Sequence, residues 1–272
     1  MLKPVREKFV KDGALLHTWE FDPGWNKRKR MVYEVIRVIG GTPLFLDDHI
    51  TRLLDSAGHA GIDAFQNEEK LVSAIGKVIS NNPAGDGNIL ICLIPNKERR
   101  HIMAWYVEHH YPGEKDYAEG IYIRTLKAIR KQPGAKIWNA ELRSKADYII
   151  SSSNAYEVLL VDRNKNITEG SRSNIFLIKG NKIYTPPESK ILKGITRQKI
   201  FDISQKFGIE INEQEIPLKD LIFYETAFIS GTSPGILPVK LIDKFRFNTS
   251  NEILRTLMTA YNEYVRKSLQ DI

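Results

Sequence analysis

Apolar and polar positions along the first third of the chain follow two periods, that of a strand and that of helices. Residues 31–39 are rich in β-branched and aromatic side chains and stop at Gly40 and Gly41, which predicts a strand closed by a hairpin turn. Helical spacing follows over 45–62 and again after Asn67, a residue type that often caps helices. The pattern therefore predicts one strand followed by two helices.

The next segments predict further strands and then a boundary. Residues 88–95 and 101–108 have the apolar character of strands, and 111–116 is the most linker-like stretch of the sequence. We place a domain boundary there. The expected organisation is a smaller N-terminal domain, 1–113, and a larger C-terminal domain, 114–272.

Strand-like and helix-like runs alternate in the second half of the chain. Strands are expected at 120–129, 158–162, 175–179, from 209 onward and at 226–230. Helical spacing covers 139–150 and 195–207, and a capping box of Thr249 and Glu252 opens a last helix. The alternation predicts a mixed α/β fold.

Composition places the chain among ordinary soluble globular proteins. Hydrophobic residues make up 42% and charged residues 27% of its 272 residues, which argues against a disordered, collagen-like or disulfide-stapled chain. The first residues are charged where a signal peptide would be apolar, and no run reaches the roughly 20 apolar residues that span a bilayer. We expect a cytoplasmic protein that neither is secreted nor enters a membrane.

Metal and disulfide chemistry find little support in the sequence. Cys92 is the single cysteine, so it forms no intramolecular disulfide and cannot by itself build a metal site. His109 and His110 follow Glu108, but adjacent side chains on a strand point to opposite faces, so a shared ion is not expected.

The net charge of +7 is compatible with an anionic ligand, a nucleic acid or simple solubility. The densest basic block is 27–30, and a weaker one comprises Lys97, Arg99 and Arg100. No nucleic-acid recognition motif accompanies either block. Both are interpreted as solvated loops, and no nucleic-acid partner is expected.

Three clusters carry candidate chemistry. They are a helix opening at His49 with Arg52, a lone Lys136, and the segment 156–197. Within that segment, the run 168–176 combines a carboxylate with small hydrogen-bonding residues on a turn beside a strand. Each cluster is weak alone, and their order along the chain is the informative feature.

This ordered set resembles the class IV, fold-type IV pyridoxal-phosphate enzymes, which include branched-chain and D-amino-acid aminotransferases and aminodeoxychorismate lyase. The resemblance covers about 31–62 and 134–240. It is carried by Val32-Tyr33-Glu34-Val35, His49-x-x-Arg52, Lys136-x-x-Asn139, Glu169-Gly170-Ser171 with Asn174, Leu192-Lys193-Gly194-Ile195-Thr196-Arg197, and Ser230-Gly231-Thr232 with Pro238-Val239. It implies two domains, with a barrel-like β core in the larger one and the cofactor in the cleft between them.

By resemblance, Lys136 is the catalytic lysine. Its amine would hold the cofactor as a Schiff base and, once freed, move a proton between the substrate Cα and C4′ of the cofactor. The simpler interpretation is a surface lysine, and Lys145 is the nearest rival. We favour Lys136 because Asn139 follows it as in the family and Glu169 lies 33 residues on (169 minus 136).

Glu169 matches the family's partner of the pyridine nitrogen. A carboxylate next to that nitrogen keeps it protonated, so that the ring withdraws electrons as the substrate Cα loses its proton. Without its neighbours, a Thr-Glu-Gly turn would be an ordinary surface feature.

The phosphate of the cofactor requires a guanidinium and free amides at a helix N-terminus. Arg52 resembles the phosphate-binding arginine, and 194–196 open a predicted helix; in the simpler alternative Arg52 pairs with Asp48 or Asp55 across a helix turn. The complete set of implied cofactor residues is Arg52, Lys136, Glu169, Ser171, Asn174, Gly194, Ile195, Thr196, Gly231 and Thr232.

The substrate side departs from the family. The basic block 27–30 replaces a Gly-Asp-Gly-like turn, Glu141 replaces a tyrosine of branched-chain aminotransferases, and 106–111 lacks the arginine of the D-amino-acid carboxylate trap. Substrate contacts are still expected from Tyr33, His110, Thr232 and Ser233.

The resemblance implies transamination between an amino acid, of the branched-chain or D-amino-acid class, and a 2-oxo acid. Aminodeoxychorismate lyase, which eliminates pyruvate, is the alternative on the same cofactor, and a non-catalytic protein of the same fold is a third. The family also implies a homodimer. The sequence does not determine the substrate or its chirality, because the deciding loops are those that depart from the family.

Overall fold

The computed structural model describes four stretches of the chain, 3–24, 31–62, 67–95 and 100–270, without the side chain of Arg100. The basic block at 27–30 therefore lies outside the described residues, as do Lys97 and Arg99 of the weaker block.

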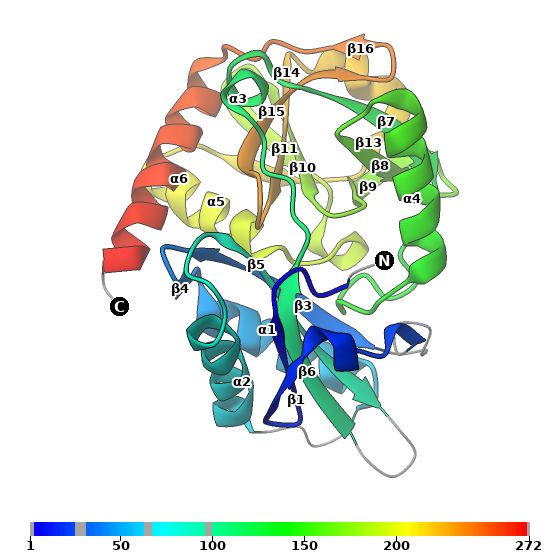
Figure 1. Cartoon of the computed structure of the whole chain (residues 1–272). Coiled ribbons are helices and arrows are strands. Elements are labelled where there is room, and N and C mark those ends of the chain that lie inside the picture. Colours follow the sequence, from blue (N-terminus) through cyan, green and yellow to red (C-terminus); the bar gives the residue numbers. More distant parts are fainter. Residues whose placement is uncertain (1–2, 25–30, 63–66, 96–99, 271–272) are drawn as a thin grey trace. The chain divides into compact units, whose positions relative to one another are not determined.

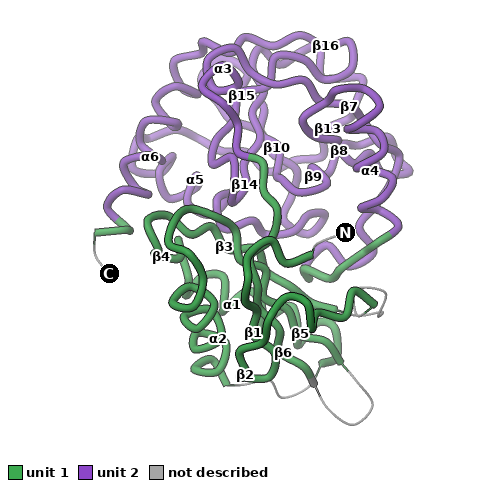
Figure 2. Tube along the Cα trace, in the orientation of Figure 1, with its two compact units in different colours: residues 1–110, 135–140, 268–272 green, residues 111–134, 141–267 purple. Residues whose placement is uncertain are grey.

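The chain divides into two compact units, drawn in different colours in Figure 2. The first unit comprises Met1–His110, Ala135–Ala140 and Ser268–Ile272. The second comprises Tyr111–Gly134 and Glu141–Lys267. The short segment that contains Lys136 thus groups with the first unit, while a single division of the chain after residue 113 stays a prediction.

An antiparallel sheet forms the centre of the first unit (Figure 1). Its described strands lie in the order β2 (Ala14–His17), β1 (Lys8–Lys11), β6 (Arg100–Val107), β5 (Gly87–Pro95), β3 (Val32–Ile39) and β4 (Thr42–Pro43). Alternate residues of β5 pack on opposite faces, Ile89 and Ile91 with the helices and Leu90 and Cys92 with an aromatic cluster. A strand buried on both faces explains the continuous apolar run in the sequence.

Helices α1 (Leu46–His59) and α2 (Glu68–Ser80) cover one face of this sheet. The predicted cap at Asn67 is confirmed, because its side chain accepts a hydrogen bond from the Lys70 amide at 3.0 Å. Leu71 and Val78 lie on the apolar side of α2 and pack in one core with residues of the sheet. A short 3₁₀ turn, η1 (Thr18–Glu20), follows β2.

Of two hairpins in this sheet, one was predicted from the sequence and the other was not. The predicted turn after β3 is confirmed, with Gly40 and Gly41 at φ of +56° and +85°. The β1–β2 hairpin was missed, although Asp12 and Gly13 have φ of +52° and +84° and Asp-Gly is a strong hairpin signal. Each of its strands has only four residues, too few for a period to stand out.

A longer, curled sheet with a barrel-like interior forms the second unit. Its described strands lie in the order β12 (Ile211–Glu213), β11 (Lys182–Thr185), β10 (Asn174–Lys179), β14 (Thr226–Gly231), β15 (Gly235–Ile242), β7 (Ile121–Lys127), β8 (Glu157–Val161), β9 (Asn166–Gly170) and β13 (Ile216–Pro217), with β16 (Phe245–Arg246) beside β15. Three pairs are parallel, namely β7–β15, β7–β8 and β11–β12. Aliphatic side chains from these strands form one core.

Helices and short 3₁₀ turns complete the fold. They are α3 (Glu114–Glu119), α4 (Ala140–Ser153), α5 (Ile195–Lys206), α6 (Glu252–Gln270), η3 (Glu188–Lys190) and η4 (Leu218–Phe223). The helices expected at 139–150 and 195–207 are confirmed as α4 and α5, within a few residues at their ends.

Two sequence predictions of this unit are wrong. The second half of the expected linker 111–116 is helical, because α3 begins inside it and the Gly113 amide donates to the Asp116 carboxylate at 2.9 Å. The last helix is capped by Asn251, whose side chain accepts from the Leu254 amide at 3.2 Å. The expected cap, Thr249, lies two residues too early.

The mixed α/β class and the barrel-like core of the larger part are confirmed. In the described ranges, no helix is both long and apolar enough to cross a membrane. The same ranges contain no group of three or more His, Cys, Asp or Glu side chains arranged to hold a metal ion.

Candidate active site

Lys136 lies on a short extended segment that pairs with the start of β3. The Tyr33 amide donates to the Lys136 carbonyl at 3.1 Å, and the Trp138 amide donates to the Met31 carbonyl at 2.8 Å. On the other side, the Lys136 amide donates to the Oγ of the fully buried Ser56 of α1 at 3.0 Å. The backbone of the lysine is therefore fixed by a strand and by a helix of the same unit.

The side chain of Lys136 lies against an aromatic ring. Its Nζ is 5.2 Å from the centroid of the Tyr33 ring, within the range of a cation–π contact. Trp138 packs edge-on against Tyr33 with ring centroids 5.4 Å apart. Tyr33 itself is buried in the aromatic cluster of the first unit. Two of the predicted residues, Tyr33 and Lys136, are thus in contact.

Arg52 belongs to a buried charged network of the same unit. Its Nε and Nη2 each donate to one oxygen of Glu34 at 2.7 Å, which is a bidentate pair. The Nδ1 of His49 lies 2.8 Å from Glu34 Oε2, and Glu34 and His49 are both almost fully buried. Glu34 lay in the motif that carries the resemblance, but no role had been assigned to it.

Burial and charge set the ionisation of this network. Burial opposes ionisation of Glu34, but the Arg52 charge and the hydrogen bonds from His49 and Arg52 outweigh it and hold the pKa of Glu34 well below its usual range. Burial is also the largest cause for His49 and lowers its pKa, with Glu34 opposing and the charges of Arg52 and Lys136 assisting. His49 is therefore a neutral imidazole near pH 7 that donates from Nδ1 to a carboxylate.

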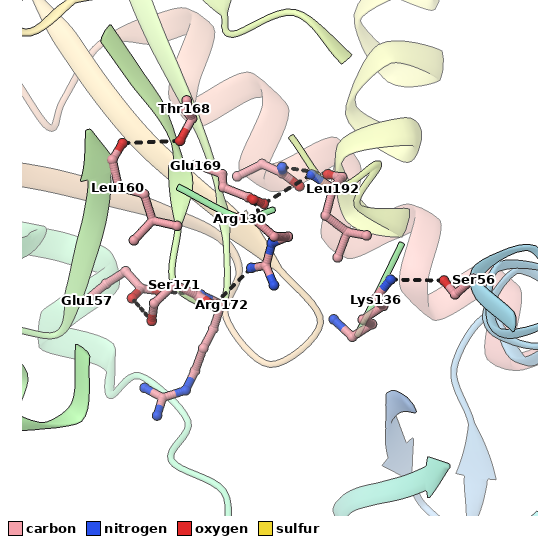
Figure 3. A network of polar contacts seen from close by, with 11 residues as sticks. Ser56, Arg130, Lys136, Glu157, Leu160, Thr168, Glu169, Ser171, Arg172 and Leu192 are labelled. Carbon is pink, nitrogen blue, oxygen red and sulfur yellow. Dashed lines mark hydrogen bonds and ion pairs between the residues drawn. The ribbon is translucent and has the colours of Figure 1, made fainter. Parts of the chain in front are cut away.

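Glu169 lies on β9 in the second unit and is 2% exposed. Its Oε1 accepts from Arg130 Nε at 2.8 Å, and its Oε2 accepts from the Leu192 amide at 3.1 Å (Figure 3). A carboxylate has about four acceptor positions, so these two bonds orient Glu169 and leave it able to accept another donor. Arg130 is a residue that the sequence did not point to, since it belongs to none of the motifs.

Leu192 connects Glu169 to the start of α5. Its carbonyl accepts from the Asn174 side-chain amide at 2.9 Å, while its own amide donates to Glu169. A Cβ on Gly194 would overlap the Asn174 side-chain oxygen. The predicted cofactor residues Glu169, Asn174 and Gly194 are therefore brought together by the structure.

The N-terminus of α5 has the properties of an anion site. Gly194 is the N-cap and supplies no side-chain cap, no acidic residue lies in the first turn, and Ile195 and Thr196 are buried. The first amides of a helix have no partner within the helix. Nearby in the sheet, Ser230 pairs with Asn174, and its buried Oγ has no hydrogen-bond partner among the described residues. These donors fit the phosphate of a cofactor.

Gly231 and Thr232 lie where β14 turns into β15. A Cβ on Gly231 would lie 3.4 Å from the Arg172 carbonyl, so this hairpin lies beside the turn that follows Glu169. The hydroxyl of Tyr117 donates to the Pro234 carbonyl at 2.9 Å and fixes the hairpin. Thr232 and Ser233 belong to this hairpin.

The structure also bears on His110, on the partner of Arg52 and on Lys145. His110 is exposed and lies beyond the end of β6, so the reasoning that placed it on a strand with His109 was wrong. Arg52 pairs with Glu34, a partner that was not among those considered. Lys145 forms an exposed pair with Glu141 one helix turn away, at 2.7 Å. None of these facts assigns a role by itself.

Each unit therefore contains some of the groups that a cofactor-dependent reaction requires. The first presents a lysine amine against a tyrosine ring, beside an oriented guanidinium. The second presents a buried carboxylate and an uncapped helix N-terminus. A pyridoxal-phosphate cofactor needs an amine, an acid for its ring nitrogen and donors for its phosphate, and the residues present fit these needs.

Comparison with known proteins agrees with this fit. Residues 31–242 match the family described as amino-transferase class IV. A D-alanine aminotransferase of Bacillus licheniformis is 31% identical over 228 residues, covering 78% of this chain and 78% of the relative. A branched-chain-amino-acid aminotransferase of Pseudomonas aeruginosa is 26% identical over 276 residues, covering 93% of this chain and 87% of the relative.

The fold is also found in solved structures. A crystal structure of a branched-chain aminotransferase from Thermoproteus uzoniensis with norvaline matches with a TM-score of 0.85 at 24% identity, over 97% of this chain and 96% of the other. The family match covers well over half of the sequence, including every motif that suggested the resemblance. The chain belongs to the class IV aminotransferase family.

Proposed function

We propose that the protein is a pyridoxal-phosphate-dependent aminotransferase that moves an amino group between an amino acid, of the branched-chain or D-amino-acid class, and a 2-oxo acid. The observation that carries this proposal is the buried Glu169, oriented by Arg130 and the Leu192 amide, in a class IV chain that also fixes Lys136 by its backbone. The fixed carboxylate of Glu169 suits the ring nitrogen of the cofactor, and the amine of Lys136 suits its covalent attachment.

When bound, the cofactor supplies a ring that withdraws electrons from the substrate Cα. We assign to Lys136 the covalent attachment of the cofactor, and its Nζ would take the proton from the substrate Cα and pass it to C4′ of the cofactor. The Tyr33 ring beside Nζ limits where that amine can move. Lys145 is less suited, since it is exposed and paired with Glu141.

Glu169 is assigned to the pyridine nitrogen. Its carboxylate holds a proton at that nitrogen through one of its remaining acceptor positions, because a negative charge nearby favours the cationic ring. Arg130 acts through Glu169 by fixing the carboxylate. This makes Arg130 a positioning residue.

The phosphate is assigned to Arg52, to the amides of Ile195 and Thr196, and to the Thr196 and Thr232 hydroxyls. The bidentate contact with Glu34 fixes the plane of the Arg52 guanidinium, and the α5 N-terminus provides oriented amides. Asn174 and Gly231 support these groups through the contacts described above, and Ser171 belongs to the turn that follows Glu169. Substrate contacts are assigned to Tyr33, Thr232 and Ser233, with His110 as a further candidate.

Activity assays distinguish this function from its alternatives. We expect purified protein supplied with pyridoxal phosphate to show visible absorption and to deaminate members of a panel of D- and L-amino acids in the presence of 2-oxoglutarate. Release of pyruvate from aminodeoxychorismate, without transamination, would instead assign the lyase activity. Cofactor uptake without either reaction would indicate a non-catalytic member of the fold.

Two further predictions accompany the function. We propose that the protein forms a homodimer, as the family implies, and that it acts in the cytoplasm on small molecules. Light scattering of the holoenzyme tests the first, and a mass corresponding to one chain would contradict it.

A further inference from the structure

Glu157 is a buried carboxylate for which the proposed chemistry has no use. It is the first residue of β8 and is 3% exposed. Its Oε1 accepts from Ser171 Oγ at 2.7 Å and from the Val158 amide at 2.8 Å. Its Oε2 accepts from Ser173 Oγ at 3.0 Å and from the Arg172 amide at 3.1 Å. Each oxygen thus binds one hydroxyl and one amide.

These four donors belong mainly to the turn that follows Glu169. The turn is closed by the Gly170 amide, which donates to the Ser173 carbonyl at 2.7 Å. The Ser171 amide donates to the Val158 carbonyl at 2.9 Å. A Cβ on Gly170 would overlap Ser173 Oγ and lie 3.2 Å from Glu157 Oε2, so the turn packs onto the carboxylate without spare room.

Both ends of the turn bind the same residue elsewhere in the chain. Glu169, immediately before the turn, accepts from the Leu192 amide, and Asn174, immediately after it, donates to the Leu192 carbonyl. Leu192 leads into Gly194 and the N-terminus of α5. The position of the turn therefore sets the distance between the acid assigned to the ring nitrogen and the helix assigned to the phosphate.

The partners of Glu157 are unusual for a buried carboxylate. All four donors are neutral, and in the described ranges Glu157 forms no ion pair with a basic side chain. Burying a carboxylate opposes folding unless donors replace its water. An apolar residue at this position would leave the Val158 and Arg172 amides and two hydroxyls without their acceptor, so the carboxylate is explained by the turn that it orients.

We propose that Glu157 is a positioning residue of the active site, which holds the turn 170–173 so that Glu169 and the α5 N-terminus meet one cofactor at the correct spacing. This inference rests on the proposed function. Glu157 does not touch the cofactor; it acts through Ser171, Ser173 and the Arg172 amide.

The four hydrogen bonds predict a graded series of variants. Glu157→Ala removes all of them. In Glu157→Gln, an NH₂ group replaces one of the two carboxylate oxygens. On that side the backbone amide loses its acceptor, but the serine hydroxyl can rotate and accept from the NH₂ group. Three of the four hydrogen bonds are therefore kept. Glu215→Ala is the matched control, because Glu215 binds the Asn166 side chain at the opposite end of β9 at 2.9 Å.

The test measures affinity for pyridoxal phosphate by reconstitution of the full-length protein, its visible absorption as a function of pH, and the Tm of the cofactor-free protein. We expect Glu157→Ala to weaken cofactor binding by about tenfold or more, as for loss of a buried acceptor, and to shift the pH at which the absorption changes. Glu157→Gln should lie between Ala and wild type, and Glu215→Ala within about twofold of wild type.

The inference would be overturned by a Glu157→Ala protein whose cofactor affinity and absorption are those of wild type. If the Tm of that protein falls at the same time, Glu157 is a merely structural residue. If Glu157→Ala fails to fold, Glu157→Gln decides by the same criteria. Failure of the proposed function looks different: wild type itself would then take up no pyridoxal phosphate.

Discussion

The two units bury carboxylates in different ways. In the first, Glu34 is matched by the cation Arg52 and by a neutral His49, all from β3 and the adjacent α1. In the second, Glu169 pairs with Arg130 from 39 residues away and Glu157 is held by neutral donors alone. The first network is balanced in charge, whereas the second combines one cation that is distant in sequence with neutral donors. We expect a break in the first network to cost mainly stability, in addition to the phosphate contact assigned to Arg52, and a break in the second to cost mainly cofactor geometry.

Breaking the first network should have the largest effect on folding. Glu34→Ala leaves the Arg52 guanidinium, which is only 12% exposed, without its carboxylate. Removing one partner of a buried pair costs about 3–5 kcal/mol, and we expect that loss in the free energy of unfolding from urea denaturation followed by circular dichroism. Asp12→Asn is the control, because Asp12 pairs with His101 at the surface. A loss under about 1 kcal/mol for Glu34→Ala would show that the network is not structural.

Breaking the pair in the second unit should have a smaller effect on stability and a larger one on activity. Arg130→Met removes the cation from Glu169 but leaves the Leu192 amide in place. We expect a loss of about 1.5–3 kcal/mol in unfolding free energy, the scale of a hydrogen bond to a charged group, together with a fall in kcat. Equal kcat for Arg130→Met and wild type would contradict the positioning role of Arg130.

A pair of glycine substitutions sharpens the contrast. Gly194→Ala places a Cβ onto the Asn174 side chain, and overpacking of this kind costs about 1–3 kcal/mol. Gly76→Ala, in the middle of α2, meets nothing within 4 Å and should stabilise by about 1 kcal/mol through helix propensity. We expect opposite shifts in Tm, and weaker cofactor binding only for Gly194→Ala. A Tm for Gly194→Ala that is not lowered would contradict the tight contact with Asn174.

Acid should weaken the first network step by step. The pKa of His49 is lowered in the folded chain, so below about pH 6.5 the unfolded chain takes up a proton that the folded one does not, and stability falls. The pKa of Glu34 is also lowered, so a second loss begins below about pH 4.3. Both contributions are present at higher pH and are lost on acidification.

The measurement is the Tm between pH 7.5 and about pH 5. For one titrating group, the free energy of unfolding changes by at most about 1.4 kcal/mol per pH unit, and the Tm changes in the same direction. His49→Gln should reduce the slope in this range, whatever its effect on the Tm at pH 7.5. An unchanged slope would show that His49 does not titrate with folding.

The strongly periodic elements could be predicted from the sequence, because one apolar face of a helix or strand is a local signal. β3, α1, α2 and α5 were found in this way, and so was the cap at Asn67. The helix cap of α6 was misplaced because several polar residues precede Glu252 and only tertiary contacts choose among them. The start of α3 inside the linker-like stretch could not be predicted, because Gly113 and Asp116 are typical of a helix start as well as of a loop.

The candidate site was predictable where a motif was compact and not where partners are distant. His49-x-x-Arg52 marks one helix face, but its partner Glu34 comes from a strand 15 and 18 residues earlier. No local signal links Arg130 to Glu169. For Glu157, the local signal is a carboxylate at the start of an otherwise apolar strand.

The central claim is that Lys136 carries the cofactor. Holoenzyme treated with borohydride and digested with trypsin tests it directly, because a modified lysine resists cleavage. If the claim holds, the label lies on a peptide spanning 132–143, which contains Lys136. A label on the peptide spanning 144–163, which contains Lys145, would contradict it.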